Sequence, residues 1–334
     1  MRKLLCGLVA AAFCAGQSQP IHLQGGARSI LDAHNCYPYE GQYANRIERA
    51  LALGYPVGIE QDLAWYDGRV VVGHSANTNG REPTLRDHFF ERVRPLVEKA
   101  LRENRRAEWP IIVVHFDVKD NREPLLRAVW SLLGEYEGWI TTAVKGPEPH
   151  QLAPFDVKPL LVLTEDSDAQ EAVFFHDVPV GGKLRVFGSA HTTKAPTEDA
   201  RERTRWVATV APEVLLAEKP TNYRRWWNNA WNEVEEGGQT KAGDWTPRTA
   251  ARLRALVDHA HRLGFWIRFY TLDGFTAAEN QGWDKNYNFG SRRAVEARWK
   301  AALDAGVDLI ATDQYEDLAG CMRAYGGVPP RPAM

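Results

Sequence analysis

A strongly apolar segment of the sequence, PIIVVHFDVK at residues 110–119, carries three titratable side chains, His115, Asp117 and Lys119. The aliphatic run at its start is typical of a strand buried on both faces. Side chains two residues apart on a strand point to the same face, so these three groups are predicted to share one side of the strand. We expect these charged groups to have partners or a function, because an unpaired charge in a protein interior is costly.

Two further acids obey the same rule in the segment VGIEQDLAW, where Glu60 and Asp62 are two residues apart. With Asp117 they would bring three carboxylates together at the ends of two strands. Three such groups in a low-dielectric site repel one another strongly unless a cation lies among them. Oxygen ligands suit a hard ion, so the residues predict one divalent metal, Mg²⁺ or Ca²⁺, bound by Glu60, Asp62 and Asp117.

The elements that must position these groups follow a repeated pattern, in which a helix ends at a glycine and an apolar strand begins at once. Thr246 and Pro247 start an amphipathic helix that ends at Gly264, before the strand FWIRFYTLD. The helix expected over Ser291–Ala305 ends at Gly306, before the strand VDLIATD.

Helices that alternate with strands to the end of the chain indicate parallel strands joined by crossover helices. The units are too many for a small sheet, and no Gly-rich dinucleotide-binding loop follows the first strand, so we predict an α/β fold of the (β/α)8 TIM-barrel type. Further strands are expected at Ile30–Asn35, Val70–His74, Pro110–Lys119, Leu160–Glu165, Leu184–Ser189 and Val214–Glu218. Such barrels carry their chemistry at the C-terminal ends of the strands. The polar residues expected there are His34, Glu60, Asp62, His74, Asp117, Lys119, Glu165, Asp273 and Asp313.

The overall charge and the N-terminus bear on partners and location. A formal net charge of −2 over 334 residues gives no indication of nucleic-acid binding. Arg2 and Lys3 precede an apolar run that ends in small residues, which predicts a signal peptide over residues 1–19. A single catalytic barrel would then occupy residues 20–334 of a secreted or periplasmic protein.

Export would place Cys36 and Cys321, the two cysteines outside the predicted signal peptide, in an oxidising compartment. They lie near opposite ends of the chain, which closure of a barrel would bring near each other. A disulfide and two half-buried free thiols both stay open as interpretations.

In this order, the motifs resemble those of the phospholipase-C-like phosphodiesterase superfamily. DAHN, GIEQD and VVVGH are similar to the His, Glu-x-Asp, His pattern of the glycerophosphodiester phosphodiesterases. FDVK at residues 116–119 is similar to a motif of the sphingomyelinase D-like phospholipases, and FYTLD and DAGVDLIATD resemble late strands of both groups. The resemblance implies a TIM-type barrel, a divalent metal on the three carboxylates named above, and phosphodiester cleavage.

By this resemblance, His34 and His74 would be the general acid and base, roles that suit histidine near neutral pH. Lys119 would neutralise charge on the phosphate. Asp273 would orient a neighbour such as Lys119, and Tyr270 would line the pocket. In this superfamily a hydroxyl of the substrate usually attacks first, which gives a cyclic phosphate.

The chain also departs from the family pattern. Glycerophosphodiesterases normally have Arg after the first His and Asp after the second, whereas this sequence has Asn35 and Ser75. The segment CYPYEGQY replaces their Pro-Glu-Asn-Thr motif, and His115 has no counterpart in the pattern. These departures concern the substrate rather than the type of reaction.

Two aromatic segments are candidates for substrate contact. TNYRRWWNNAWNEVE, at residues 221–235, offers Arg224, Arg225 and Trp226 to a phosphate or a polyol. The equally weighted alternative is a helix that packs its tryptophans on the barrel, and contact of these aromatics with a lipid surface is a third. The second segment, DGFTAAENQGWDKNYNFG, carries Trp283 in a long loop after a strand.

The sequence thus predicts an exported, metal-dependent phosphodiesterase. Its substrate would be a small-molecule or lipid diester, namely a glycerophosphodiester, a lysophospholipid or a phosphoinositide-like molecule. No obligate protein partner is indicated, and transient contact with a membrane surface is open. Two other classes remain, a glycoside hydrolase with paired carboxylates and a barrel that binds ligands without catalysis.

Overall fold

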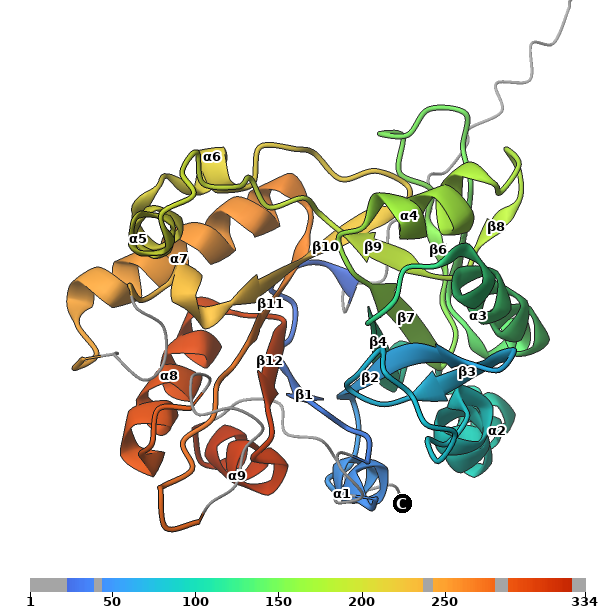
Figure 1. The fold of residues 1–334 in the computed structure, drawn as a ribbon, viewed down its shortest axis with the longest axis horizontal. Helices are drawn as coiled ribbons and strands as arrows, with labels where there is room; N and C mark the ends of the chain where they lie inside the picture. The colour runs from blue at the N-terminus through green and yellow to red at the C-terminus, as the bar shows by residue number, and fades with distance from the viewer. Residues whose placement is uncertain (1–22, 39–43, 237–242, 280–287, 326–334) are drawn as a thin grey trace, which may run out of the picture.

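The computed structural model describes residues 23–38, 44–236, 243–279 and 288–325 (Figure 1). The predicted signal peptide and Trp283 lie outside these residues. In the part that is described, no helix combines the length and apolar character needed to cross a membrane.

Eight parallel strands close into a barrel, which confirms the predicted (β/α)8 architecture (Figure 1). Around the barrel the strands run in the order β1, β12, β11, β10, β9, β7, β4, β2, and β2 pairs with β1 to close it. Their bounds are β1 (Ile30–Ala33), β2 (Val57–Tyr66), β4 (Ile112–Val118), β7 (Leu160–Thr164), β9 (Phe187–Ser189), β10 (Arg224–Ala230), β11 (Trp266–Tyr270) and β12 (Leu309–Thr312).

Helices surround the barrel (Figure 1), and the expected start and stop signals operate at two of them. Thr246 accepts a hydrogen bond from the Thr249 backbone at the start of α7, and Gly264 ends that helix with a φ of 95°. Gly306 ends α8 in the same left-handed conformation, with a φ of 77°. The α-helices are α1 (Arg46–Ala52), α2 (Glu91–Glu103), α3 (Glu123–Glu135), α4 (Asp168–Glu171), α5 (Ala200–Thr209), α6 (Pro212–Leu215), α7 (Pro247–Leu263), α8 (Arg292–Ala305) and α9 (Tyr315–Tyr325).

Two expected strands have a different place. The strand expected at Val70–His74 is β3 (Arg69–Val72), which pairs antiparallel with β2 in a hairpin and is not part of the closed barrel. The strand expected at Val214–Glu218 is wrong, since the short helix α6 begins there at Pro212 and the barrel strand is β10. Three short strands, β5 (Thr142–Val144), β6 (Phe155–Asp156) and β8 (Lys183–Leu184), form a separate antiparallel sheet.

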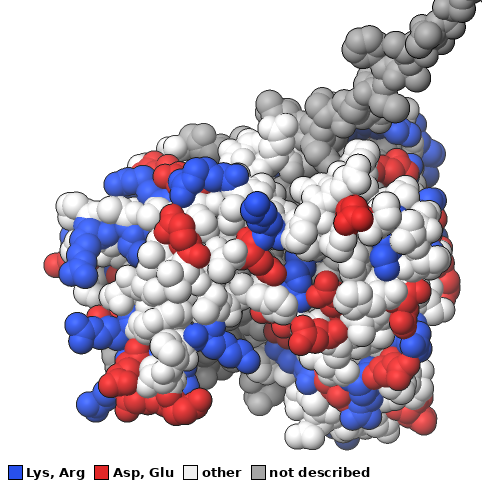
Figure 2. All heavy atoms as spheres, turned by 90° about the horizontal axis from the view of Figure 1, so that it is seen from above, with Lys and Arg blue, Asp and Glu red and all other residues white. Residues whose placement is uncertain are grey.

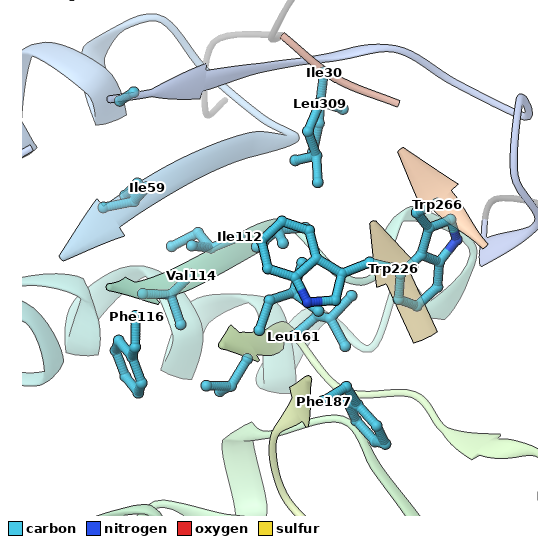
Figure 3. Close-up of a cluster of buried hydrophobic side chains, with 14 of the residues drawn as sticks. Ile30, Ile59, Ile112, Val114, Phe116, Leu161, Phe187, Trp226, Trp266 and Leu309 are labelled. Carbon is cyan, nitrogen blue, oxygen red and sulfur yellow. The ribbon is translucent and has the colours of Figure 1, made fainter. Parts of the chain in front are cut away.

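Apolar side chains fill the barrel toward the N-terminal ends of its strands. The indole of Trp226 lies within this cluster, between Leu309 and Leu161 in the view of Figure 3. Trp226 also contacts a buried polar residue, His115, and the centroids of the two rings are 4.8 Å apart. The interior therefore changes from apolar to polar along the barrel axis, and the polar part lies where the strands end.

Gly58 makes room for one of these interior polar groups. It pairs with Asp32 across β1 and β2, and a Cβ atom at Gly58 would lie 2.9 Å from the Asp32 Cα and closer still to its carboxylate. Asp32 in turn accepts a hydrogen bond of 2.5 Å from Arg268 Nε. The missing side chain thus lets a buried ion pair fit inside the barrel.

We expect Gly58→Ala to lower the free energy of unfolding by about 1–3 kcal/mol, because the methyl group overpacks the interior. Urea denaturation followed by circular dichroism measures this change. Gly138→Ala is the matched control, since a Cβ there would meet no atom within 4 Å. Equal midpoints for the two variants would contradict this account of the barrel interior.

Candidate active site

A polar cavity of about 380 Å³ lies at the C-terminal ends of the barrel strands. Residues within or just after β1, β2, β4, β7, β10 and β11 contribute to it, together with His74 just after the hairpin strand β3. The lining consists of His34, Asn35, Glu60, Asp62, His74, Asp117, Val118, Lys119, Asn121, Glu165, Asp166, Ser167, Gln170, Asn228, Arg268 and Tyr270. Side chains far apart in the sequence thus meet at the end of the barrel where the sequence placed the chemistry.

The three predicted metal ligands converge in this cavity. Glu60, Asp62 and Asp117 each offer an oxygen within 4.8 Å of the other two. The strand register explains this arrangement, because Asp62 pairs directly with Asp117 across β2 and β4, and Glu60 is two residues earlier on the same face. Lys119 Nζ bridges the aspartates, at 2.8 Å from Asp62 Oδ2 and 2.7 Å from Asp117 Oδ2.

These carboxylates carry more negative charge than Lys119 offsets. Burial and the neighbouring charges of Asp117 and Glu60 raise the pKa of Asp62 well above its usual range. Burial and the charge of Glu165 likewise raise the pKa of Asp117. The raised pKa values indicate that the two aspartates favour an added positive charge, whether a proton or a metal ion. Glu60 differs, because the charges of His34 and Arg268 outweigh its burial and lower its pKa well below the usual range.

The donor set fits a hard divalent cation. The Tyr37 hydroxyl donates to Asp62 Oδ2 over 2.7 Å, and the Asn35 backbone N–H donates to Glu60 Oε2 over 2.8 Å. Lys119 donates to Oδ2 of Asp117 over 2.7 Å and lies 2.8 Å from Oδ2 of Asp62. Carboxylates oriented by such contacts are the ligands that Mg²⁺ and Ca²⁺ prefer.

Beneath the cluster, a buried polar network that we did not predict from the sequence holds Glu60. Arg268 donates from Nη2 to Glu60 Oε1 at 3.3 Å and from Nη1 to Asn228 Oδ1 at 3.0 Å. His115 Nδ1 lies 3.5 Å from the same Glu60 oxygen, and its Nε2 lies 2.5 Å from Glu165 Oε1. The contributions of Arg268 and Asn228 could have been suspected only from polar residues at alternate positions of apolar strands.

His34, the first predicted acid–base residue, is oriented by Asp313. Its Nδ1 lies 2.8 Å from Asp313 Oδ1, and Arg46 donates to the other Asp313 oxygen over 3.2 Å and 3.3 Å. Burial alone would lower the pKa of His34, but the charge of Glu60 and the bond to Asp313 outweigh it and raise the pKa to about 9. The pair resembles a His–carboxylate dyad in which the carboxylate fixes the imidazole and stabilises its charged form.

His74, the second predicted acid–base residue, is half-buried in the wall of the same cavity. Burial and the positive charges of Lys119 and His34 lower its pKa. The two imidazoles therefore differ in their preferred charge state. Such a difference is what one acid and one base on opposite sides of a reacting group require.

Asp273 has a different neighbour from the one we expected. It does not orient Lys119, because its Oδ1 accepts hydrogen bonds from Thr312 Oγ1 at 2.6 Å and from the Asp313 backbone at 2.7 Å. It therefore supports the Asp313–His34 dyad from outside the cavity. Burial, followed by the charge of Asp313, raises the pKa of Asp273 to about 7.

Of the predicted substrate contacts, Tyr270 lines the cavity and three others do not. The Tyr270 ring is stacked with that of His34 at a centroid separation of 6.2 Å. Arg224 is buried and donates to Glu171 Oε2 at 2.6 Å. Arg225 lies at the opposite end of the barrel, and Trp226 donates its indole N–H to the Thr164 carbonyl at 3.0 Å within the core.

The expected wall formed by residues 221–235 therefore needs correction, since the segment contains β10, a buried barrel strand, and not a substrate-binding loop or a helix. The charge of Arg224 is balanced there by acids, and the tryptophans pack inside the protein. Cys36 and Cys321 are both buried free thiols, which is the second of the two interpretations left open.

No family model matches the chain, and no curated protein does. Among solved structures, a putative glycerophosphoryl diester phosphodiesterase from Silicibacter pomeroyi is 12% identical, with a TM-score of 0.46 over 92% of this chain and 97% of that one. The phosphatidylinositol-specific phospholipase C from Listeria monocytogenes is 11% identical, with a TM-score of 0.41 over 91% and 97%.

HPPK-DHPS from Plasmodium falciparum is also similar, with 10% identity and a TM-score of 0.43 over 90% of this chain and 48% of that one. Likeness at this level carries no argument about function, because barrels of one architecture host unrelated chemistry. The argument for function therefore rests on the cavity.

Proposed function

We propose that this protein is a metal-dependent phosphoric diester hydrolase. One observation carries the proposal, namely that two imidazoles of different charge preference and a cluster of three carboxylates line a single cavity. Cleavage of a phosphodiester needs a base at the attacking oxygen, an acid at the leaving oxygen and positive charge near the phosphate. The cavity offers all three kinds of group.

The two histidines divide the proton transfers. His74, whose pKa is lowered, would take the proton from the attacking hydroxyl. His34 would give its proton to the leaving oxygen. Asp313 would keep the imidazole in its orientation until it is protonated again. Lys119, bridged between two carboxylates at the cavity wall, would face the phosphate charge.

A bound divalent ion would be held by Glu60, Asp62 and Asp117 and would offset charge on the non-bridging phosphate oxygens. Arg268 and the Asn35 backbone N–H both donate hydrogen bonds to Glu60, at 3.3 Å and 2.8 Å. This support keeps the carboxylate oriented before substrate arrives, which limits the reorganisation needed during the reaction.

The lining favours a polar substrate. Val118 contributes the only aliphatic side chain among the described residues of the cavity wall, and Tyr270 is the only aromatic apart from the histidines. An acyl chain would find little apolar surface there, whereas a glycerol or inositol-like head group could hydrogen-bond to Asn121, Ser167 and Asn228. Such a head group also carries a hydroxyl beside the phosphate, which supports attack by the substrate itself and a cyclic phosphate product.

We expect the protein to cleave water-soluble glycerophosphodiesters, with activity falling to background in EDTA and returning with Mg²⁺ or Ca²⁺. A panel of glycerophosphocholine, glycerophosphoinositol and lysophosphatidylcholine, followed by phosphorus NMR, measures rate and product together. A cyclic phosphate would support attack by a substrate hydroxyl. Release of inorganic phosphate from monoesters alone would contradict the proposal.

The same panel, extended by an aryl glycoside, separates the two other classes. A glycoside hydrolase of the paired-carboxylate type would act on sugars and keep its activity in EDTA. A non-catalytic barrel would turn over none of these substrates at any metal concentration.

A further inference from the structure

A second cavity, of about 530 Å³, lies at the opposite end of the barrel. Its walls come from segments just before β1, β7 and β11 and from the second residue of β10, which are the N-terminal ends of barrel strands. The described residues that line it are Leu23, Gln24, Gly25, Leu152, Pro154, Phe155, Arg225, His261, Gly264 and Trp266. None of them belongs to the candidate active site.

Among the described residues of this lining, Arg225 is the one cationic side chain for which the described part of the chain offers no acidic partner. It is only 5% exposed, and it donates to two backbone carbonyls, from Nη2 to Ala153 at 2.9 Å and from Nε to Asn222 at 3.3 Å. Its guanidinium also lies 4.9 Å from the Phe155 ring centroid. Nη1 donates to no described atom and is not sealed from solvent, so it borders the cavity.

No carboxylate balances the charge of Arg225 in the described part of the chain. Asp308, an acid at the same end of the barrel, is already committed to His261 Nε2 at 2.8 Å, the Ile267 backbone at 2.8 Å and the Gly26 backbone at 2.7 Å. The 22 residues that precede Leu23 contain no Asp or Glu. Burial lowers the pKa of Arg225 to about 10, which reflects the cost of this uncompensated charge.

The rest of the wall is largely apolar. The rings of Phe155 and Trp266 are stacked at a centroid separation of 5.7 Å, and Leu23 and Pro154 complete this side. Leu152, which is 42% exposed, adds an aliphatic side chain that is accessible to solvent. One buried cation within apolar walls matches a ligand that is apolar except for a single negative group.

We propose that this cavity binds an apolar molecule with one anionic head group, such as a medium-chain carboxylate. The head group would accept hydrogen bonds from Arg225 Nη1, and the apolar part would lie against Phe155 and Trp266. The site is separate from the proposed phosphodiesterase cavity, so either proposal can fail without the other.

The test compares octanoate with octanol, which share a chain but differ in charge, as competitors of the fluorescent anion 1-anilinonaphthalene-8-sulfonate at pH 7. We expect octanoate to displace the dye from the full-length protein at a concentration at least about tenfold lower than octanol, because a charge-assisted hydrogen bond is lost with the alcohol. In Arg225→Met the two competitors should become equivalent. His34→Gln should keep the wild-type ratio, because His34 is at the other end of the barrel.

A second variant guards against misfolding of Arg225→Met. Leu152→Glu adds a carboxylate at the exposed edge of the cavity. The concentration of octanoate needed to displace the dye should rise at least about tenfold, whereas that of octanol should change little. Equal potency of octanoate and octanol in the wild type, or no dye binding at all, would overturn the proposal. So would a folded Arg225→Met protein, or Leu152→Glu, that keeps the wild-type ratio.

Discussion

Replacing His34 by glutamine is expected to lower kcat for phosphodiester cleavage by about 10²–10⁴-fold, the usual contribution of a general acid or base. In the wild type, His34 Nδ1 lies 2.8 Å from Asp313 Oδ1. Glutamine can still hydrogen-bond to this carboxylate, but it cannot exchange a proton with a leaving oxygen. KM should change much less, since the substitution removes proton transfer rather than binding. Steady-state kinetics with the best diester of the panel measures both parameters.

The matched control is His176→Gln, which changes an exposed histidine that does not line the cavity. It should leave kcat within about twofold of wild type, in line with a substitution away from the reacting groups. The kcat of Asp313→Asn should lie between those of His34→Gln and His176→Gln, because this substitution disturbs the imidazole without removing it. A His34→Gln protein with native circular dichroism and wild-type kcat would remove His34 from the mechanism.

Replacing Asp62 by asparagine is expected to act on activity and on stability with opposite signs. It removes one of three carboxylates that could hold the metal, so kcat/KM should fall about 10²-fold or more at low metal concentration and recover in part at high concentration. Without metal, the same change relieves the repulsion that raises the pKa of Asp62, and it leaves Lys119 paired with Asp117 at 2.7 Å. The metal-free variant should therefore be at least as stable as the metal-free wild type.

Thermal unfolding with and without Mg²⁺ or Ca²⁺ measures the second effect. A metal that binds only the folded state raises the Tm of the wild type, and this increase should shrink in Asp62→Asn. Asp120→Asn is the control, since Asp120 pairs with Arg122 and does not line the cavity. A full metal-induced increase of Tm in Asp62→Asn would show that the ion, if any, is bound elsewhere.

Most of the fold could be predicted from the sequence, and the main failure has a clear cause. Aliphatic residues from Val214 onward favoured a strand, but Pro212 starts a helical turn there and the barrel strand is β10. The β10 sequence RRWWNNA looked unlike a buried strand. It is buried because Glu171 pairs with Arg224 and because Trp226 fills the barrel interior. Both conditions depend on residues far away in the chain.

In the candidate site, too, groupings within one strand could be predicted and contacts between distant strands could not. Alternation along single strands correctly grouped Glu60 with Asp62 and Asp117 with Lys119, and the structure brings these side chains together. Partners on other strands escaped prediction. Asp313 contacts His34, Asp273 hydrogen-bonds to Thr312 and the Asp313 backbone rather than orienting Lys119, and Arg268 reaches Glu60 from β11.

By itself, the sequence determined the local features of this protein: where helices end at glycines, which side chains of a strand share a face, and which strand ends carry acids and histidines. These follow from backbone geometry within a few residues. Only the tertiary structure decided which of those faces meet, because pairing register and barrel closure depend on the packing of every strand at once. It therefore paired His34 with Asp313, brought Arg268 to Glu60, and left Arg225 with no acidic partner among the described residues at the other end of the barrel.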